Sequence, residues 1–262
     1  MGGNGVQMSR YFINSTQITK NQITIIGEDY QHLKKVLRAV KGDFITVCCD
    51  GFDYTTEISE ISSNSISSII IDKKKNLTEA ALKVTLFQGL PKADKMELIV
   101  QKCIELGVNE IVPVITERCI SKINTSSDAQ NKVSRWQKIA LEAAKQCNRG
   151  IVPKIGIPIK FIEATLLASK MDLSVIPYEK ESATGFNTVV SKCSDVVTAS
   201  IFIGPEGGFT QQEIQFAESQ NIRKISLGPR ILRTETAGMV ALSLMMYELG
   251  DVSNGRNKVC NC

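Results

Sequence analysis

The spacing of apolar residues divides the chain near residues 72–81. Before this point, short alternating runs typical of β-strands dominate, and Asp50-Gly51 between two of them predicts a two-residue hairpin turn. One amphipathic helix is predicted at 28–40. Its apolar face comprises Leu33, Val36, Leu37 and Val40. The predicted strands make a small β-rich domain covering residues 8–75, and they lie at 11–14, 23–26, 43–49, 52–61 and 65–71.

From residue 82 onward, strand-like runs alternate with helical periodicity. This alternation predicts a mostly parallel sheet covered by helices on both faces, in an α/β domain at 76–250 that a tail at 251–262 follows. In such sheets ligands bind beyond the carboxyl ends of the strands. The last helix is apolar nearly all round, so we expect it to be buried in its own fold or against another chain. The predicted strands are 84–87, 110–115, 172–176, 198–203 and 223–227, and the predicted helices are 91–106, 132–149, 210–219 and 235–249.

Composition narrows the class of protein. The 262 residues are 43% hydrophobic and 22% charged, which is typical of a globular protein. No apolar run is long enough to span a bilayer, and the first residues, MGGNGVQ, lack the apolar core of a signal peptide. We interpret residues 1–7 as a disordered leader, with Met8 as a candidate natural start, and we expect a cytoplasmic protein without a membrane partner. The net charge of +4 does not by itself establish a nucleic-acid partner.

Several kinds of chemistry are disfavoured by the residues present. The eight cysteines contain no C-x-x-C pair and His32 is the only histidine, so we predict free thiols in a reducing compartment and no metal. The sequence also lacks the motifs G-x-x-x-x-G-K-[ST], G-x-G-x-x-G, G-x-S-x-G and H-E-x-x-H. Hydrolysis by a serine–histidine pair is disfavoured because His32 lies in the small domain.

Two glycine-bearing loops each follow a predicted strand. The first, GPEGG at 204–208, lets the backbone approach a ligand closely, and Thr210-x-x-Glu213 predicts a capping box for the next helix. The second loop, 227–236, contains a glycine and two arginines. One helix and one strand separate the loops, so we expect them at the same edge of neighbouring strands, as opposite walls of one pocket. Taken alone, each loop is equally consistent with a plain capped turn.

The residues of both loops carry a specific resemblance. GPEGGFT followed by SLGPRILRTETA is similar to the hallmark of the RsmE family of ribosomal RNA methyltransferases, which belongs to the SPOUT superfamily. HLKKVLRAVKGD, KADKMELIVQKCIELGVNEIVPVITERC and EAAKQCNR–GIVP match as well, so the resemblance covers nearly all of residues 10–249. It implies a PUA-like β-barrel, then a SPOUT-type parallel-sheet domain with a trefoil knot that binds S-adenosyl-L-methionine without a metal. It further implies a homodimer that methylates N3 of a specific uridine in the 16S rRNA of the small ribosomal subunit.

The resemblance and the chemistry of methylation suggest roles for individual residues. Uracil N3 must lose a proton, so the site needs a base or a cation that stabilises the developing anion. Arg233 suits the cation, and Glu206 is a candidate base, although holding the loop is an equally good interpretation of Glu206. The residues expected to bind the cofactor, through backbone groups and apolar walls, are Pro177, Tyr178, Glu179, Gly204, Pro205, Glu206, Gly207, Gly208, Leu227, Gly228, Arg230, Ile231, Leu232, Thr236 and Ala237.

Another set of polar residues is expected to contact RNA. Gln146 and Arg149 match a segment that reaches the neighbouring subunit's site in related dimers, so Arg149 is also a catalytic candidate. Polar residues that complement the dipole at a helix C-terminus are an equal explanation for both. The candidates in the small domain could contact phosphates of the RNA. A solvated helix face is the alternative explanation for the polar residues there. The candidates are Arg10, His32, Arg38, Gln146 and Arg149.

Three other functions stay open at this point. Another SPOUT enzyme would methylate a ribose 2′-hydroxyl or a guanine, but the GPEGGFT form of the first loop and the N-terminal domain favour the uridine enzyme. A non-catalytic RNA-binding assembly factor would keep the fold without binding S-adenosylmethionine. An enzyme acting on small nucleotides would need no RNA.

Overall fold

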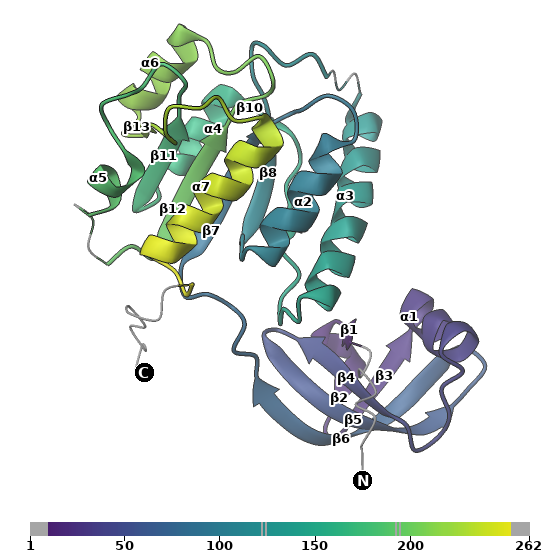
Figure 1. Ribbon diagram of the computed structural model, residues 1–262. Coiled ribbons are helices and arrows are strands. Elements are labelled where there is room, and N and C mark those ends of the chain that lie inside the picture. Colours follow the sequence, from purple (N-terminus) through teal and green to yellow (C-terminus); the bar gives the residue numbers. More distant parts are fainter. Residues whose placement is uncertain (1–9, 122, 124, 192, 194, 253–262) are drawn as a thin grey trace. The chain divides into compact units, whose positions relative to one another are not determined.

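The computed structural model describes residues 10–252 except 122, 124, 192 and 194 (Figure 1). Its described part divides into two compact units. The first comprises residues up to Glu79 together with 144–152, and the second comprises the remainder. The hydrophobic pattern did not indicate that 144–152 group with the first unit. The predicted domain ranges stay predictions, and the leader at 1–7 and most of the tail at 251–262 lie outside the described residues.

A six-stranded sheet forms the first unit, in the order β1-β4-β5-β6-β3-β2, and every pair is antiparallel except β1 with β4. Asp50 and Gly51 both have positive φ and make the predicted turn between β4 and β5. Alternate strand residues such as Ile23, Ile25 and Val47 form its buried core. The elements are β1 (Arg10–Phe12), η1 (Ser15–Gln17), β2 (Ile18–Thr19), β3 (Gln22–Ile26), β4 (Phe44–Cys49), β5 (Phe52–Ile61) and β6 (Ser65–Lys75).

The helix predicted at 28–40 is shorter than expected. α1 (Gly27–Gln31) continues into a π-helical turn, η2 (His32–Val36), and the chain then leaves the helix at Arg38, whose φ is 53°. Of the predicted apolar face only Leu33 is buried, and the other three residues are 45% to 66% exposed. The helix predicted from the apolar periodicity is too long, because Arg38 has a left-handed backbone conformation that turns the chain before the last predicted helical turn is complete.

The second unit contains a seven-stranded sheet in which every described pair is parallel, as predicted. The order is β10-β8-β7-β12-β11-β13, and β9 pairs with β8. The prediction that the two glycine-bearing loops follow neighbouring strands was wrong, because β11 lies between β12 and β13. The strands are β7 (Lys83–Gly89), β8 (Glu110–Ile115), β9 (Lys154–Ile155), β10 (Ile159–Lys160), β11 (Leu173–Pro177), β12 (Thr198–Ile203) and β13 (Arg223–Ile225), of which β9 and β10 were not predicted.

Helices cover both faces of this sheet (Figure 1). α2 (Lys95–Glu105), α5 (Phe186–Val190) and α7 (Thr234–Glu248) pack on one face, and α4 (Phe161–Ala168) and α6 (Gln211–Ser219) on the other. Beneath α4, the rings of Phe87 and Phe202 stack with their centroids 4.7 Å apart. α3 (Ser126–Gln146) begins earlier than the predicted helix, and α4 and α5 were not predicted. Within the described chain, no helix is both long and apolar enough to cross a bilayer.

Candidate active site

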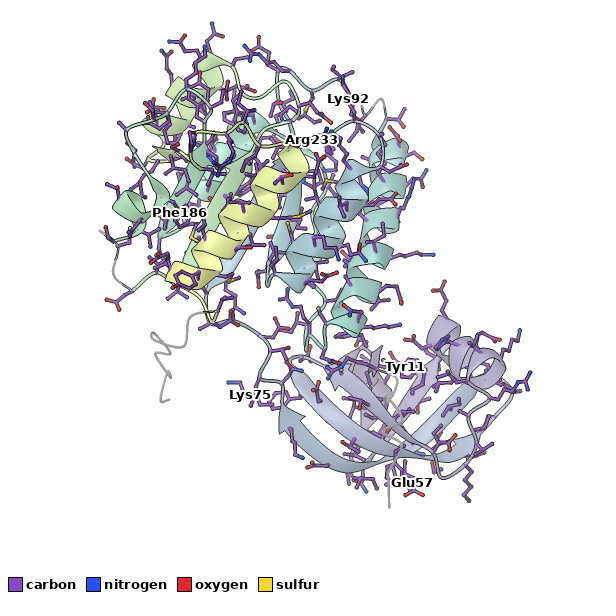
Figure 2. The ribbon with its side chains drawn as sticks, viewed as in Figure 1. Tyr11, Glu57, Lys75, Lys92, Phe186 and Arg233 are labelled. Atoms are coloured by element: carbon purple, nitrogen blue, oxygen red, sulfur yellow. The ribbon has the colours of Figure 1, made fainter. Side chains whose placement is uncertain are left out.

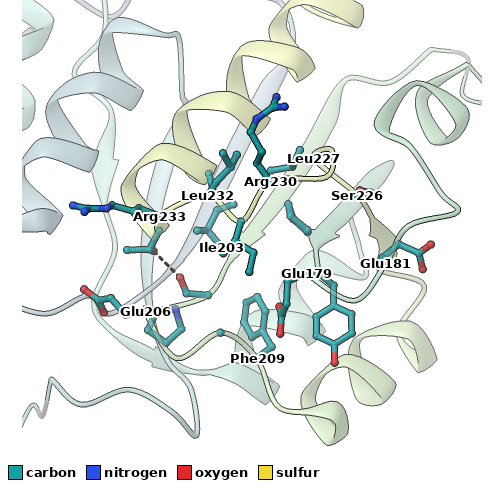
Figure 3. Close-up of a pocket in the computed structure, with 18 of the residues that line it drawn as sticks. Glu179, Glu181, Ile203, Glu206, Phe209, Ser226, Leu227, Arg230, Leu232 and Arg233 are labelled. Atoms are coloured by element: carbon teal, nitrogen blue, oxygen red, sulfur yellow. Dashed lines mark hydrogen bonds between the residues drawn. The ribbon is translucent and has the colours of Figure 1, made fainter.

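Three adjacent strands, β12, β11 and β13, end at one edge of the second sheet, and the segments that follow them line a single cavity (Figure 3). The cavity volume is about 530 Å³, which is within the range of small-molecule sites. The structure therefore brings the two glycine-bearing loops together, with the end of β11 between them. All residues predicted to bind the cofactor line this cavity except Thr236, which is exposed on the first turn of α7.

The first loop, 204–209, lies very close to the end of β7. A Cβ atom on Gly89 would lie 2.6 Å from Pro205 Cδ, so only glycine allows this approach. The loop enters α6 through the predicted capping box, which is confirmed. Thr210 N–H donates to Glu213 Oε2 (2.8 Å), and Glu213 N–H donates to Thr210 Oγ1 (3.2 Å). Backbone geometry thus constrains this loop at both ends.

Glu206 holds the first loop through its carboxylate. One oxygen lies 2.8 Å from Lys95 Nζ and accepts a hydrogen bond from Lys92 N–H (3.2 Å). Burial raises the pKa of Glu206, but the hydrogen bonds from Lys95 and Lys92 outweigh it, and the pKa lies below its ordinary value of 4.5. A carboxylate of lowered pKa is a weak proton acceptor, so the geometry favours loop-holding over general-base catalysis. Lys95 also lies 3.5 Å from Glu235 Oε2 and so connects this loop to α7.

The second loop, 227–236, runs into the first turn of α7. The backbone N–H groups of Leu227 and Leu232 have no hydrogen-bond partner within the described part of the chain, and both residues line the cavity. Together with Ile203, their side chains supply apolar surface to the cavity (Figure 3). Ile231, which was predicted as an apolar wall, also lines the cavity but is 88% exposed. This loop therefore offers free backbone donors beside apolar walls.

Arg230 and Arg233 lie at the rim of the cavity. Both are exposed, and neither forms an ion pair within the described residues. Figure 3 shows both side chains extending away from the centre of the cavity. Arg233 is the N-cap residue of α7, and Figure 2 shows it at the same end of the second unit as Lys92. The guanidinium groups of Arg230 and Arg233 are therefore two cations available at the rim for an anionic ligand.

The third wall begins at the last residue of β11, Pro177, and continues through Tyr178 and Glu179. Tyr178 N–H donates to Ile225 O (3.0 Å), which fixes this wall against β13. The carboxylate of Glu179 has no hydrogen-bond or ion-pair partner among the residues that the structure describes. Further residues line the cavity although they were not among the binding residues chosen from the sequence, and most of them lie inside the two predicted loops or directly beside the predicted segments. These are Lys95, Glu181, Ile203, Phe209, Ser226, Pro229 and Thr234.

Arg118, also missed from the sequence, fastens the first loop from the segment after β8. Its Nη1 donates to Gly207 O (3.0 Å) and more weakly to Phe209 O (3.4 Å). A Cβ atom on Gly207 would lie 3.0 Å from Arg118 Cβ, so the two backbones are in close contact. A signal for Arg118 was present, because it follows the carboxyl end of a correctly predicted strand, where ligand sites of parallel sheets lie.

Two of the candidates for RNA contact are occupied in ion pairs of the first unit. Arg149 is 6% exposed and forms a two-point pair with Glu79 (Nη2–Oε2 2.6 Å, Nε–Oε1 3.2 Å). Burial raises the pKa of Glu79, but the hydrogen bond from Arg149 outweighs it and the pKa is lowered. Arg10 forms a similar pair with Asp53 (2.9 and 3.0 Å) and donates to Arg149 O (3.0 Å). These contacts argue against catalysis by Arg149 and against phosphate contacts of either arginine.

The other candidates for RNA contact, His32, Arg38 and Gln146, are exposed. None of them lines the cavity. His32 Nδ1 lies 3.1 Å from the hydroxyl of Tyr11, which orients the imidazole ring. Across the described residues, no group of three His, Cys, Asp or Glu side chains is arranged to hold a metal ion.

Both units match known families. Residues 78–246 match the RNA methyltransferase domain family, and residues 25–71 match the RNA methyltransferase PUA domain family. The parallel sheet with its cavity and these two matches define the class of the protein as an RNA methyltransferase with an N-terminal PUA domain.

Individual relatives narrow this class. The ribosomal RNA small subunit methyltransferase E of Bacillus subtilis is 37% identical over 253 residues, covering 92% of this chain and 97% of the relative. That of Mesomycoplasma hyopneumoniae is 33% identical, covering 90% and 98%. The crystal structure of the Neisseria gonorrhoeae enzyme bound to S-adenosyl methionine is 29% identical with a TM-score of 0.81, covering 94% of this chain and all of that one. A methyltransferase from Legionella pneumophila in complex with the same cofactor is 31% identical with a TM-score of 0.83, over the same shares of both chains. The chain belongs to the ribosomal RNA small subunit methyltransferase E family, which confirms the resemblance seen in the two loops.

Proposed function

We propose that this chain transfers the methyl group of S-adenosyl-L-methionine to N3 of a specific uridine in the 16S rRNA of the small ribosomal subunit. The observation that carries the proposal is the single cavity formed by the two glycine-bearing loops. It is supported by relatives that are named for methylation of small-subunit ribosomal RNA, one of which is bound to S-adenosyl methionine.

The residues of the cavity fit this cofactor. The free N–H groups of Leu227 and Leu232 match the polar edge of adenine, and the apolar surface around them suits its ring. The unpaired carboxylate of Glu179 suits the ribose hydroxyls, which donate hydrogen bonds to carboxylates. When bound, S-adenosylmethionine supplies an electrophilic methyl group on a positively charged sulfur.

Arg233 is proposed to act on the nucleobase. Uracil N3 carries a proton that must leave, and negative charge then develops on the carbonyl oxygens of the ring. The exposed guanidinium of Arg233 offers several donors at the start of α7, where the helix dipole adds positive potential. Since N3 lies on the Watson–Crick edge, the uridine reaches the cavity only when it is unpaired and turned out of its stack.

The remaining parts of the proposal concern the assembly and its surroundings. We propose RNA contacts for His32, Arg38 and Gln146, whose side chains are exposed, and no longer for Arg10 or Arg149. A homodimer is supported by α7, whose Tyr247 is 55% exposed although the helix is apolar nearly all round. A ribosomal substrate implies a cytoplasmic location. The knotted backbone path implied by the family resemblance also stays a proposal.

The test is transfer of tritium from labelled S-adenosylmethionine to small ribosomal subunits that lack the modification, followed by mapping of the labelled nucleotide. We expect label on N3 of one uridine. Label on a ribose or on a guanine would show a different methyltransferase. No transfer, with no heat on titration of the cofactor, would favour the non-catalytic assembly factor, and transfer to free uridine compounds would favour a nucleotide enzyme.

A further inference from the structure

A chain of buried polar groups connects the two loops of the cavity. Gln88, near the end of β7, is fully buried, and its Nε2 donates to Thr234 Oγ1 (2.9 Å) and to Gly89 O (3.0 Å). Thr234 Oγ1 donates in turn to Gly204 O at 2.6 Å, the bond that is dashed in Figure 3. Gly204 opens the first loop and Thr234 closes the second. The bonds therefore join the two loops to each other and to the strand beneath them.

The packing of the second unit holds these groups in place. Gln88 lies opposite Ile203 in the pairing of β7 with β12, so its side chain lies beside the start of the first loop. α7 approaches closely over it, because a Cβ atom on Gly238 would lie 3.5 Å from Gln88 Oε1. Thr234, the first residue of α7, is only 6% exposed although it lines the cavity. Strand pairing and helix packing thus converge on one hydroxyl group.

The hydroxyl of Thr234 is committed as a donor by these contacts. It has a single proton, which it donates to Gly204 O, and it accepts the Gln88 amide on the same oxygen. A group so occupied has no proton left to offer a ligand. Through that proton, Thr234 acts on a ligand by way of the loops whose separation it controls.

We propose that Thr234, supported by Gln88, is a positioning residue that sets the separation of the two loops and thereby the affinity of the cavity for S-adenosylmethionine. The inference rests on the proposed function, since it takes that cofactor as the ligand. Gly204 has no side chain with which to fix itself, so its carbonyl needs an external donor to hold one orientation. A preorganised loop loses less conformational entropy when the ligand binds, which appears as tighter binding.

The test compares four variants by calorimetric titration with S-adenosylmethionine and by thermal unfolding. Thr234→Val keeps the shape and removes the hydroxyl, Thr234→Ser keeps the hydroxyl, and Gln88→Leu removes the supporting donor. The matched control is Thr165→Val on α4, because Thr165 is fully buried, donates only to Ile162 O of its own helix (2.8 Å) and does not line the cavity.

We expect Thr234→Val to raise the Kd for the cofactor on the order of tenfold, which corresponds to about 1.4 kcal/mol. Gln88→Leu should raise it in the same direction, whereas Thr234→Ser and Thr165→Val should stay within roughly twofold of the unaltered protein. Equal Kd values for Thr234→Val and Thr165→Val, at similar losses of melting temperature, would show that Thr234 is structural only. Failure of Thr234→Ser to restore affinity would also overturn the inference. If the unaltered protein itself gives no heat, the proposed function fails and the inference fails with it.

Discussion

Glutamine in place of Glu206 distinguishes the two roles that the sequence left open for this residue. The substitution keeps the shape of the side chain and an oxygen that can accept from Lys92 N–H, which now lies 3.2 Å away. It removes the charge that pairs with Lys95 at 2.8 Å. The two side chains of this pair are 27% and 31% exposed, so solvent screens much of their attraction. As a loop-holding residue, Glu206 should therefore be replaceable at a small loss.

The expected magnitude follows from that exposure. We expect Glu206→Gln to raise the KM for S-adenosylmethionine by roughly twofold to fivefold, because a partly exposed ion pair contributes little and the amide keeps the backbone contact. The kcat should change by less than about threefold, since no proton passes through this residue in the loop-holding role. A general base would give the opposite pattern, with kcat reduced by roughly 100-fold or more.

The pH dependence gives a second, independent readout. The pKa of Glu206 is lowered from 4.5, so the carboxylate is already ionised at neutral pH. The stabilisation it provides is present above the ordinary pKa and is lost only as the pH falls through the lowered one. Profiles of kcat for the unaltered protein and Glu206→Gln should therefore run parallel between pH 6 and 9, measured as tritium transfer to small subunits at saturating cofactor. A fall of kcat toward low pH that is seen in the unaltered protein and disappears in the variant, together with the large loss of kcat, would refute the loop-holding role.

Three further predictions test other residues. Arg233→Ala should reduce methyl transfer by roughly 100-fold or more while leaving the circular dichroism spectrum unchanged, and near-normal turnover of this variant would remove Arg233 from catalysis. Arg233→Lys should restore little, because lysine lacks the planar donor fork, and near-normal turnover of this variant would show that positive charge alone suffices. Arg149→Met should destabilise the first unit by about 3 kcal/mol in urea unfolding at neutral pH, because it leaves the carboxylate of Glu79 without its arginine partner. The loss should shrink as the pH falls toward and below 4.5, because burial without the arginine raises the pKa of Glu79 and the carboxyl then takes up a proton more readily. A loss under about 0.5 kcal/mol at neutral pH would mean that the pair is replaceable. Burial raises the pKa of Cys48 and of Cys103 to about 12, so the thiolate fraction of each at pH 8 is on the order of 10⁻⁴. Iodoacetamide should therefore modify both cysteines only after unfolding, as measured by peptide mass spectrometry. Rapid labelling of either cysteine in the folded protein would contradict this.

Elements with a strong local signal were predictable from the sequence. The strand at 198–203 coincides with β12, because a short apolar run ends at Gly204 and a capped helix follows. α4 was missed because it has only eight residues and begins directly after the two-residue strand β10. The helix at 28–40 was overextended because a left-handed residue can interrupt a regular apolar pattern without changing it. Local patterns thus locate cores better than they locate ends.

The candidate site shows the same division between local and distant information. Each loop could be recognised from its own residues, and the structure brings the two loops together. The place of β11 between β12 and β13 could not be read, because strand order depends on pairing between segments far apart in the chain. Nor could the contact of Gln88 with Thr234, which are 146 residues apart. The burial of Arg149 in an ion pair with Glu79, 70 residues away along the chain, could not be read from the sequence either.

The glycine-rich first loop has to be restrained before a ligand binds, and other contacts of the site provide that restraint. Backbone freedom of this kind costs about 1 kcal/mol or more per residue when a ligand orders it, so an unrestrained GPEGG segment would bind weakly. Three separate groups restrain it before any ligand arrives. Arg118 donates to the carbonyl of Gly207, Thr234 donates to that of Gly204, and Lys95 pairs with Glu206 between them. Because the restraints come from different elements, loss of any one should weaken binding modestly, whereas loss of two should weaken it by more than the sum if they act on one shared loop conformation.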